Sequence, residues 1–167
     1  QMEIKKSLPA VVNKNSKILI LGSMPGEESL RRQEYYGFKG NQFWRLIAAV
    51  LDIDVPPDNY EKRLELLYAG QIALWDVIES CSREGSLDTN IRNEQPNDIL
   101  RLLKESSIEA VFFNGKKAAE SFRKSFGFDI LERENIFFRI LPSSSPANTI
   151  GFEKKLTEWT IIRSVLH

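Results

Sequence analysis

The chain has 167 residues, of which 42% are hydrophobic and 28% charged, a length that suits one folded domain with its own core and is short for two. Lysine and arginine number 23, as do aspartate and glutamate, so the formal net charge is zero and binding of nucleic acid by overall positive charge is excluded. We therefore expect a single domain over residues 1–167, in which any site for a polyanion is local.

The chain contains one cysteine and one histidine, which excludes several kinds of site. Disulfide scaffolds, cysteine-rich zinc sites and iron–sulfur clusters need several thiolates, and Cys81 stands alone. His167 is the last residue, where chains commonly fray, so neither a histidine relay nor a histidine-based metal site is expected. No segment has the roughly 20 apolar residues of a membrane span, and the first residues lack the apolar core of a signal peptide. We expect a cytoplasmic protein without metal or cofactor.

Four short apolar runs alternate with helical segments along the chain. The runs at 17–22, 71–77, 109–114 and 136–141 are short and rich in Ile, Val and Phe, and they predict strands. Apolar residues three or four apart predict helices over 41–51, 59–69, 97–106, 116–126 and from about 153 to 166. This alternation is typical of an α/β protein whose mostly parallel sheet is covered on both faces. We predict a three-layer α/β/α sandwich with a mostly parallel four-stranded sheet, and the polar segment 82–96 as its least regular part.

Ligands of open parallel sheets bind beyond the carboxyl ends of the strands, so function is expected in the segments 22–26, 76–83, 114–117 and 142–148. The first has the sequence Gly-Ser-Met-Pro-Gly, which matches neither a dinucleotide-binding fingerprint nor a phosphate-binding P-loop. It is either a tight turn or a loop whose glycines let a ligand approach the backbone.

Aromatic residues surround a candidate functional amide at Asn41. Asn41 stands where a helix is expected to begin, so it is either a helix cap or a polar group of a site. Phe43 lies within the predicted helix, where a core position is the simpler interpretation. Tyr36 and Phe38 precede the helix, and exposed flat rings of this kind stack on flipped bases.

The segment 142–148 has the sequence Pro-Ser-Ser-Ser-Pro-Ala-Asn. It is either an ordinary rigid turn or a stiff loop whose N–H and O–H groups bind phosphate oxygens. With Lys116 and Lys117, which follow the preceding strand, it would form a local ridge that contacts a nucleic-acid backbone.

Together these segments resemble the uracil-DNA glycosylase superfamily, and most of all its hypoxanthine-DNA (deoxyinosine) glycosylase branch. The resemblance is carried by residues 22–26, 29–30, 35–37, 41–45, 73–78, 81, 83, 85–88, 113–118 and 141–147 and spans nearly the whole chain. It implies a parallel four-stranded sheet between helices and a monomeric enzyme that flips a deaminated base out of damaged DNA, double-stranded or single-stranded, and hydrolyses its N-glycosidic bond. No lysine falls in the catalytic segment, so no lyase step at the abasic site is expected.

The resemblance also implies roles for individual residues. The mismatch-specific branch has a catalytic asparagine where this chain has Met24, whereas in the hypoxanthine branch the catalytic asparagine corresponds to Asn41. Asn114 would read the base edge or stabilise the negative charge of the departing base. The base pocket is expected to include Gly22, Ser23, Met24, Pro25, Gly26, Tyr36, Phe38, Phe43 and Asp76. Contacts with DNA are expected from Lys116, Lys117, Ser143, Ser144, Ser145, Pro146, Ala147 and Asn148.

Hypoxanthine is the expected base. Excision of mismatched uracil or of xanthine by the same chemistry is the first alternative. A non-catalytic binder of nucleic acid or nucleotide on the same scaffold is the alternative from another class.

Overall fold

The main sheet has four parallel strands in the order β3-β2-β6-β7. The computed structural model describes residues 4–166. In it the strands are β2 (Ile18–Gly22), β3 (Ile72–Asp76), β6 (Ala110–Asn114) and β7 (Phe137–Leu141). Each of the four predicted apolar runs contains one of these strands. Both β2 and β6 have a partner on each side and lie between helices, which explains why their sequences are continuously apolar.

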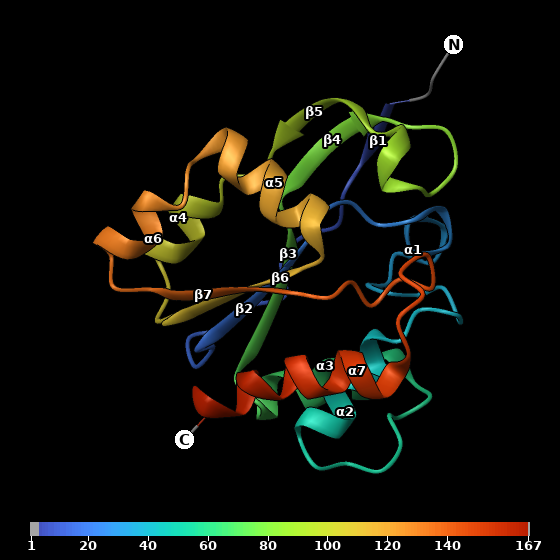
Figure 1. The fold of residues 1–167 in the computed structure, drawn as a ribbon, viewed down its shortest axis with the longest axis vertical. Helices are drawn as coiled ribbons and strands as arrows, with labels where there is room; N and C mark the ends of the chain where they lie inside the picture. The colour runs from blue at the N-terminus through green and yellow to red at the C-terminus, as the bar shows by residue number, and fades with distance from the viewer. Residues whose placement is uncertain (1–3, 167) are drawn as a thin grey trace.

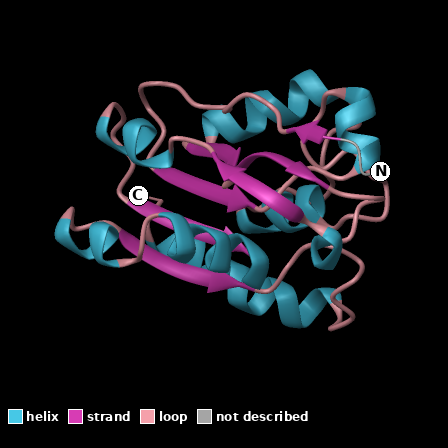
Figure 2. Ribbon diagram, turned by 90° about the horizontal axis from the view of Figure 1, so that it is seen from above, coloured by secondary structure: helices cyan, strands magenta, loops and turns pink. Residues whose placement is uncertain are grey.

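Helices cover both faces of this sheet (Figures 1 and 2). One layer consists of α2 (Phe43–Val50), α3 (Tyr60–Ala69), α7 (Phe152–Trp159) and the 3₁₀ turn η2 (Thr160–Ser164), and the other of α4 (Ile99–Lys104), α5 (Lys116–Ser125) and α6 (Asp129–Arg133). Alternate side chains of β2 point to the two layers, since Ile18 and Ile20 belong to one buried cluster and Leu19 and Leu21 to the other. The predicted three-layer sandwich is therefore confirmed.

A second, antiparallel sheet that the sequence pattern did not predict has the strand order β1-β4-β5. Its strands are β1 (Ile4–Lys6), β4 (Ile78–Ser82) and β5 (Arg92–Pro96). The expectation of an irregular segment at 82–96 is thus corrected, because this segment also holds the 3₁₀ turn η1 (Asp88–Asn90). Most of β5 is exposed and polar, so it lacks the apolar alternation by which a strand is predicted. The short helix α1 (Glu27–Arg32) was not predicted either.

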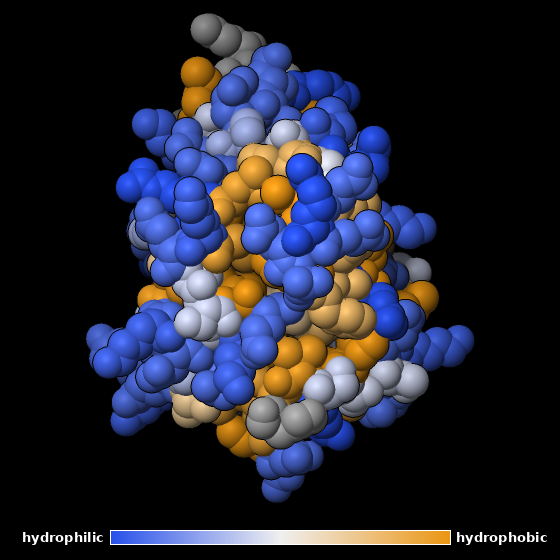
Figure 3. Space-filling model, turned by 90° about the vertical axis from the view of Figure 1, so that its left-hand side faces the viewer, coloured by the Kyte–Doolittle hydropathy of each residue, from blue (hydrophilic) through white to orange (hydrophobic). Residues whose placement is uncertain are grey.

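Several further expectations concern the ends and the surface of the chain. His167 lies outside the described residues. No helix in the described part is long and apolar enough to span a bilayer. No group of three or more His, Cys, Asp or Glu side chains suited to a metal ion occurs among residues 4–166. On the side where the parallel strands begin, hydrophobic surface lies between hydrophilic residues (Figure 3).

Candidate active site

The expected site lies where the strand order of the main sheet reverses. From β2 the chain passes to β3 on one side, and from β3 it crosses to β6 on the other side of β2. The loops after β2 and β6 therefore diverge, and such a crevice is where open α/β sheets bind ligands. Gly22 ends β2, Asn114 ends β6 and Asp76 ends β3, so three of the predicted site residues meet at this edge.

The side chain of Asn114 is held by Tyr36 and Ser144. Its Nδ2 donates to the Tyr36 hydroxyl at 3.1 Å and to Ser144 Oγ at 2.9 Å, and its Oδ1 accepts from the Ser144 N–H at 2.9 Å. Both amide hydrogens are thus used, and only a lone pair of Oδ1 stays free. In this arrangement Asn114 can accept a hydrogen bond from a base edge, whereas the expected donation to a departing anion lacks a free hydrogen.

Several residues are placed differently from what the sequence pattern led us to expect. Ser144, expected to contact DNA, is only 1% exposed and is bound to Asn114. Phe43 is completely buried and its ring stacks under that of Tyr36, with centroids 3.9 Å apart, so it supports the pocket from the core. Met24 is buried in the small core of the second sheet. Phe38, 54% exposed, is the aromatic residue of this region that remains open to a base.

The interpretation of Asn41 as the helix cap is corrected, because Gln42 is the N-cap of α2 and Asn41 precedes it, closing a local turn with Phe43. Asn41 Oδ1 accepts a hydrogen bond from the Phe43 N–H at 2.9 Å, which fixes the orientation of the amide. Its Nδ2 donates to no group in the described part of the chain, so this end of the amide is available. The next residue, Gln42, donates its N–H to the Ser144 carbonyl at 3.0 Å, which ties the Asn41 segment to the partner of Asn114.

Asp76 is a buried carboxyl group with an unpaired oxygen. The residue is 3% exposed, and Oδ2 accepts no hydrogen bond from any described residue. The pKa of Asp76 is raised to about 7, chiefly by burial and in smaller part by nearby Asp88, against the charge of Arg83, which lowers it. A Cβ at Gly22 would lie 2.5 Å from Asp76 Oδ1 and 2.9 Å from the Tyr36 hydroxyl oxygen, so glycine is required for both groups to approach the end of β2.

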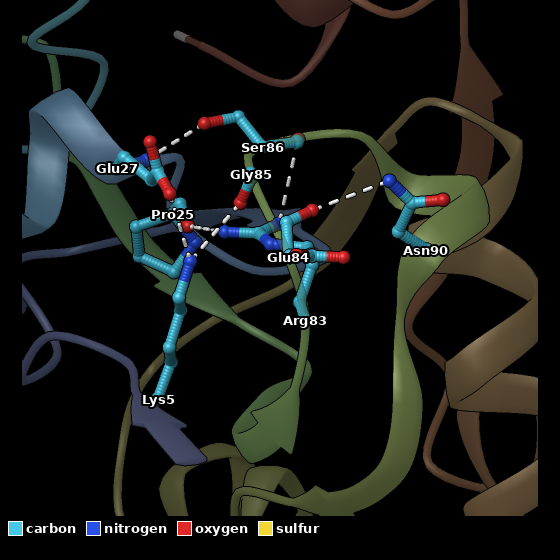
Figure 4. Close-up of polar contacts among 8 residues, drawn as sticks. All are labelled: Lys5, Pro25, Glu27, Arg83, Glu84, Gly85, Ser86 and Asn90. Carbon is cyan, nitrogen blue, oxygen red and sulfur yellow. Dashed lines mark hydrogen bonds and ion pairs between the residues drawn. The ribbon is translucent and has the colours of Figure 1, made fainter. Parts of the chain in front are cut away.

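The loop 22–26 is held by the segment that follows β4. Ser23 Oγ donates to Asp88 Oδ1 at 2.7 Å, and the Glu27 N–H donates to Ser86 Oγ at 2.9 Å (Figure 4). The unpredicted second sheet therefore positions one wall of the site. No local pattern in the sequence indicated these contacts, although residues 83 and 85–88 were part of the family resemblance.

Two side chains of α7 hold the loop 142–148 through hydrogen bonds to its backbone carbonyls. Trp159 Nε1 donates to the Pro142 carbonyl at 2.9 Å. The ammonium group of Lys155, a completely buried residue, donates to the Ser145 carbonyl at 3.1 Å. Burial lowers the pKa of this lysine. Neither residue was expected in the site, because a position on an amphipathic helix indicates only core packing.

The hydroxyl groups of this loop are engaged in its own turns. Ser143 Oγ accepts from the Ser145 N–H, and Ser145 Oγ accepts from the Ala147 N–H, both at 3.1 Å. Asn148 Oδ1 accepts from the Ile150 N–H at 3.3 Å. Pro146 and Ala147 are exposed and form the outermost part of the loop. The predicted stiff loop is therefore present, with its tip at residues 146–147.

The two lysines expected beside this loop differ in their surroundings. Lys117 Nζ forms an ion pair with Glu94 Oε2 at 2.7 Å. Because β5 brings Glu94 next to it, Lys117 is already paired with a carboxylate in the free protein, and its expected contact with DNA stays a prediction. Lys116 is exposed at the start of α5 and remains the candidate for a phosphate contact. A hollow of about 580 Å³ between α4 and residues 12–14 contains none of the predicted site residues.

Known proteins resemble this chain over nearly its whole length. The family model described as Uracil DNA glycosylase superfamily matches residues 9–164. A Methanosarcina acetivorans protein named hypoxanthine DNA glycosylase is 40% identical over 163 residues, which cover 95% of this chain and 98% of that protein. A Methanosarcina barkeri protein of the same name is 38% identical over 159 residues, 93% of this chain and 95% of that protein. A solution NMR structure from Methanosarcina acetivorans, described as a candidate uracil DNA glycosylase, superposes with a TM-score of 0.84 at 39% identity and covers 99% of this chain and 100% of its own.

Proposed function

The chain belongs to the uracil DNA glycosylase superfamily, and on that premise we propose that it removes hypoxanthine from DNA by hydrolysing the N-glycosidic bond. It is a DNA glycosylase, and both Methanosarcina relatives carry the name of the hypoxanthine-specific activity. We infer that the chain forms one glycosylase domain, since a single family model spans residues 9–164. We further propose that it acts as a monomer on double-stranded DNA and leaves an abasic site without a lyase step.

Discrimination against undamaged adenine rests on unpaired polar groups around the end of β2. Asp76 Oδ2 lacks a donor, and within residues 4–166 the N–H groups of Met24 and Gly26 lack an acceptor. A deaminated base such as hypoxanthine presents a lactam, in which a C=O group stands beside an N–H group, whereas adenine presents an amino group beside an unprotonated nitrogen. An ionised carboxylate can accept from the lactam N–H, and backbone N–H groups can donate to the lactam C=O. In adenine the donor and acceptor positions are reversed, so the same groups do not pair with it. Because Asp76 is 3% exposed, a base reaches it only after the surrounding loops part.

We infer that Asn41 positions the attacking water. Its Oδ1 accepts from the Phe43 N–H, so this bond holds the rotamer while Nδ2 stays free to orient a water molecule at C1′. Cleavage passes through an oxocarbenium-like sugar, for which a well-placed water and stabilisation of the base matter more than a strong base. The lone pair of Asn114 Oδ1 would accept from the base edge, and Phe38 would stack on the base or on its neighbours.

Ser144 is expected to act through Asn114. Replacing Ser144 by alanine removes one acceptor of the Asn114 amide, and we expect single-turnover base release to slow by about tenfold. Because Ser144 is buried, the salt dependence of duplex binding should remain that of the wild type. The single-turnover rate and the salt dependence of duplex binding are therefore both measured. A normal rate combined with a weaker salt dependence would show that Ser144 contacts phosphate and does not act through Asn114.

A panel of duplexes, each with one altered base, tests the proposed function. We expect abasic product, detected as strand cleavage after alkali, to form fastest from hypoxanthine and not at all from the matched undamaged duplex. Strands should stay intact before the alkali step. If uracil or xanthine is released faster than hypoxanthine, that base is the preferred substrate. If no base is released at high enzyme concentration, the protein is a non-catalytic binder and the proposed function is wrong.

A further inference from the structure

Arg83 is a completely buried arginine immediately after β4. Its guanidinium group carries a positive charge, and burial of a charge is unfavourable by several kcal/mol when it forms no ion pair. Both groups that accept its hydrogen bonds are backbone carbonyls, those of Pro25 and Ser86. A buried charge whose direct contacts are backbone carbonyls, with carboxyl groups only nearby, indicates a function beyond packing.

The hydrogen bonds of Arg83 are unequal. Nη2 donates to the Pro25 carbonyl, whereas Nη1 reaches the Ser86 carbonyl only at 3.5 Å, the long limit of a hydrogen bond (Figure 4). Nε is buried and has no acceptor among the described residues. The guanidinium group is therefore committed mainly to the Pro25 carbonyl, which lies in the loop after β2.

The Pro25 carbonyl belongs to the same peptide group as the Gly26 N–H. The structure contains no cis peptide bond among residues 4–166, so this N–H points away from the carbonyl and hence away from Arg83. It has no acceptor in the described part of the chain. A charged donor on the carbonyl side polarises the peptide and makes its N–H a stronger donor.

The charge of Arg83 also reaches the carboxyl groups around the site. It lowers the pKa of both Asp76 and Asp88, against the effect of their burial. Arg83 thus acts on groups on both sides of the loop 22–26 while remaining shielded from solvent. A shielded charge is effective because water does not screen it.

We propose that Arg83 is a positioning residue for base excision, which orients and polarises the Pro25–Gly26 peptide so that this peptide stabilises the negative charge of the departing base. In the hydrolysis the C1′–N9 bond breaks, its electron pair stays on N9, the water oxygen bonds to C1′, and the proton of the water ends on the released base. The inference rests on the proposed function. It adds to the site a residue, Arg83, that contacts neither the base nor the attacking water.

The experiment compares two leaving groups in two Arg83 variants. Single-turnover release is measured for hypoxanthine and for 2-fluorohypoxanthine, whose electron-withdrawing fluorine makes it a better leaving group. In Arg83→Met we expect release of hypoxanthine to slow by about 10²-fold, in line with the loss of one preorganised donor, and release of the fluorinated base to slow clearly less. Arg83→Lys, which keeps the charge, should recover part of the rate, and if Arg83→Met does not fold, Arg83→Lys alone carries the comparison with wild type.

A matched control is available at Arg163, which also donates to backbone carbonyls, those of Ala49 and Val50, outside the site. Arg163→Met should leave both rates unchanged. Equal slowing of the two bases in the Arg83 variants would overturn the inference and reduce Arg83 to a structural role. A wild-type enzyme that releases no hypoxanthine would instead contradict the proposed function.

Discussion

Replacing Asn41 by alanine is expected to lower the single-turnover rate of hypoxanthine release by about 10²-fold or more, because a polar group positioned at the transition state is lost. The free Nδ2 of Asn41 is the group concerned, since Oδ1 already serves the Phe43 N–H. Binding of the duplex should change little, so the effect is expected on the chemical step. Rates at saturating enzyme and binding to a non-cleavable duplex separate the two.

Two controls distinguish catalysis from a structural role of Asn41 in the turn before α2. Asn41→Ser keeps a side-chain oxygen that can accept from the Phe43 N–H and removes the amide, so stability should be retained while the rate falls. Asn59→Ala removes a side-chain bond to the backbone at the start of another helix, α3, where Asn59 Oδ1 accepts from the Lys62 N–H at 3.2 Å, and activity should persist. Normal turnover in Asn41→Ser would reduce Asn41 to this structural role.

Asp76→Asn is expected to make the protein more stable at alkaline pH. The pKa of Asp76 is about 7 in the folded chain and 3.8 ordinarily, so the folded state binds more protons between these values and wild-type stability falls as pH rises through this window. Removing the titration should raise the free energy of unfolding by roughly 2–4 kcal/mol at pH 8, and progressively less as pH falls toward 4. Urea unfolding across this range measures the difference. A pH-independent difference would contradict the assigned pKa.

The same substitution should change the pH dependence of excision. If the ionised carboxylate accepts the lactam N–H, wild-type kcat/KM for hypoxanthine should rise as pH passes about 7, the pKa of Asp76. In Asp76→Asn this rise should disappear, and preference over adenine should weaken because the amide also offers a donor. An unchanged pH profile would show that another group controls the reaction.

The sequence pattern was sufficient for the main sheet and insufficient for the second one. The strands β2, β3 and β6 are buried on both faces or nearly so, which forces apolar runs that can be recognised without a structure. The edge strand β7 is mostly exposed and was recognisable because its sequence is still largely apolar. The strands β1 and β5 are three and five residues long and consist mostly of exposed polar residues. Their pairing with β4 rests on backbone hydrogen bonds, which have no signature in composition.

The site was predictable in its location and not in its contacts. Asn114 could be selected because it ends a buried strand at the ligand-binding edge. Its partners Tyr36 and Ser144 lie 78 and 30 residues away in sequence, so only the tertiary structure brings them together. The pairing of Lys117 with Glu94 and the buried contact of Arg83 with Pro25 depend on the unpredicted sheet in the same way.

The bond between Asn114 and Ser144 has a consequence for newly synthesised chains. Asn114 has both of its side-chain partners only after β7 has docked beside β6, because Tyr36 precedes β6 in the chain whereas Ser144 follows β7. A chain that ends before β7 would have the loop after β2 and the bond from Asn114 to Tyr36, but would lack Ser144. Full competence to release a base should therefore arise late in synthesis.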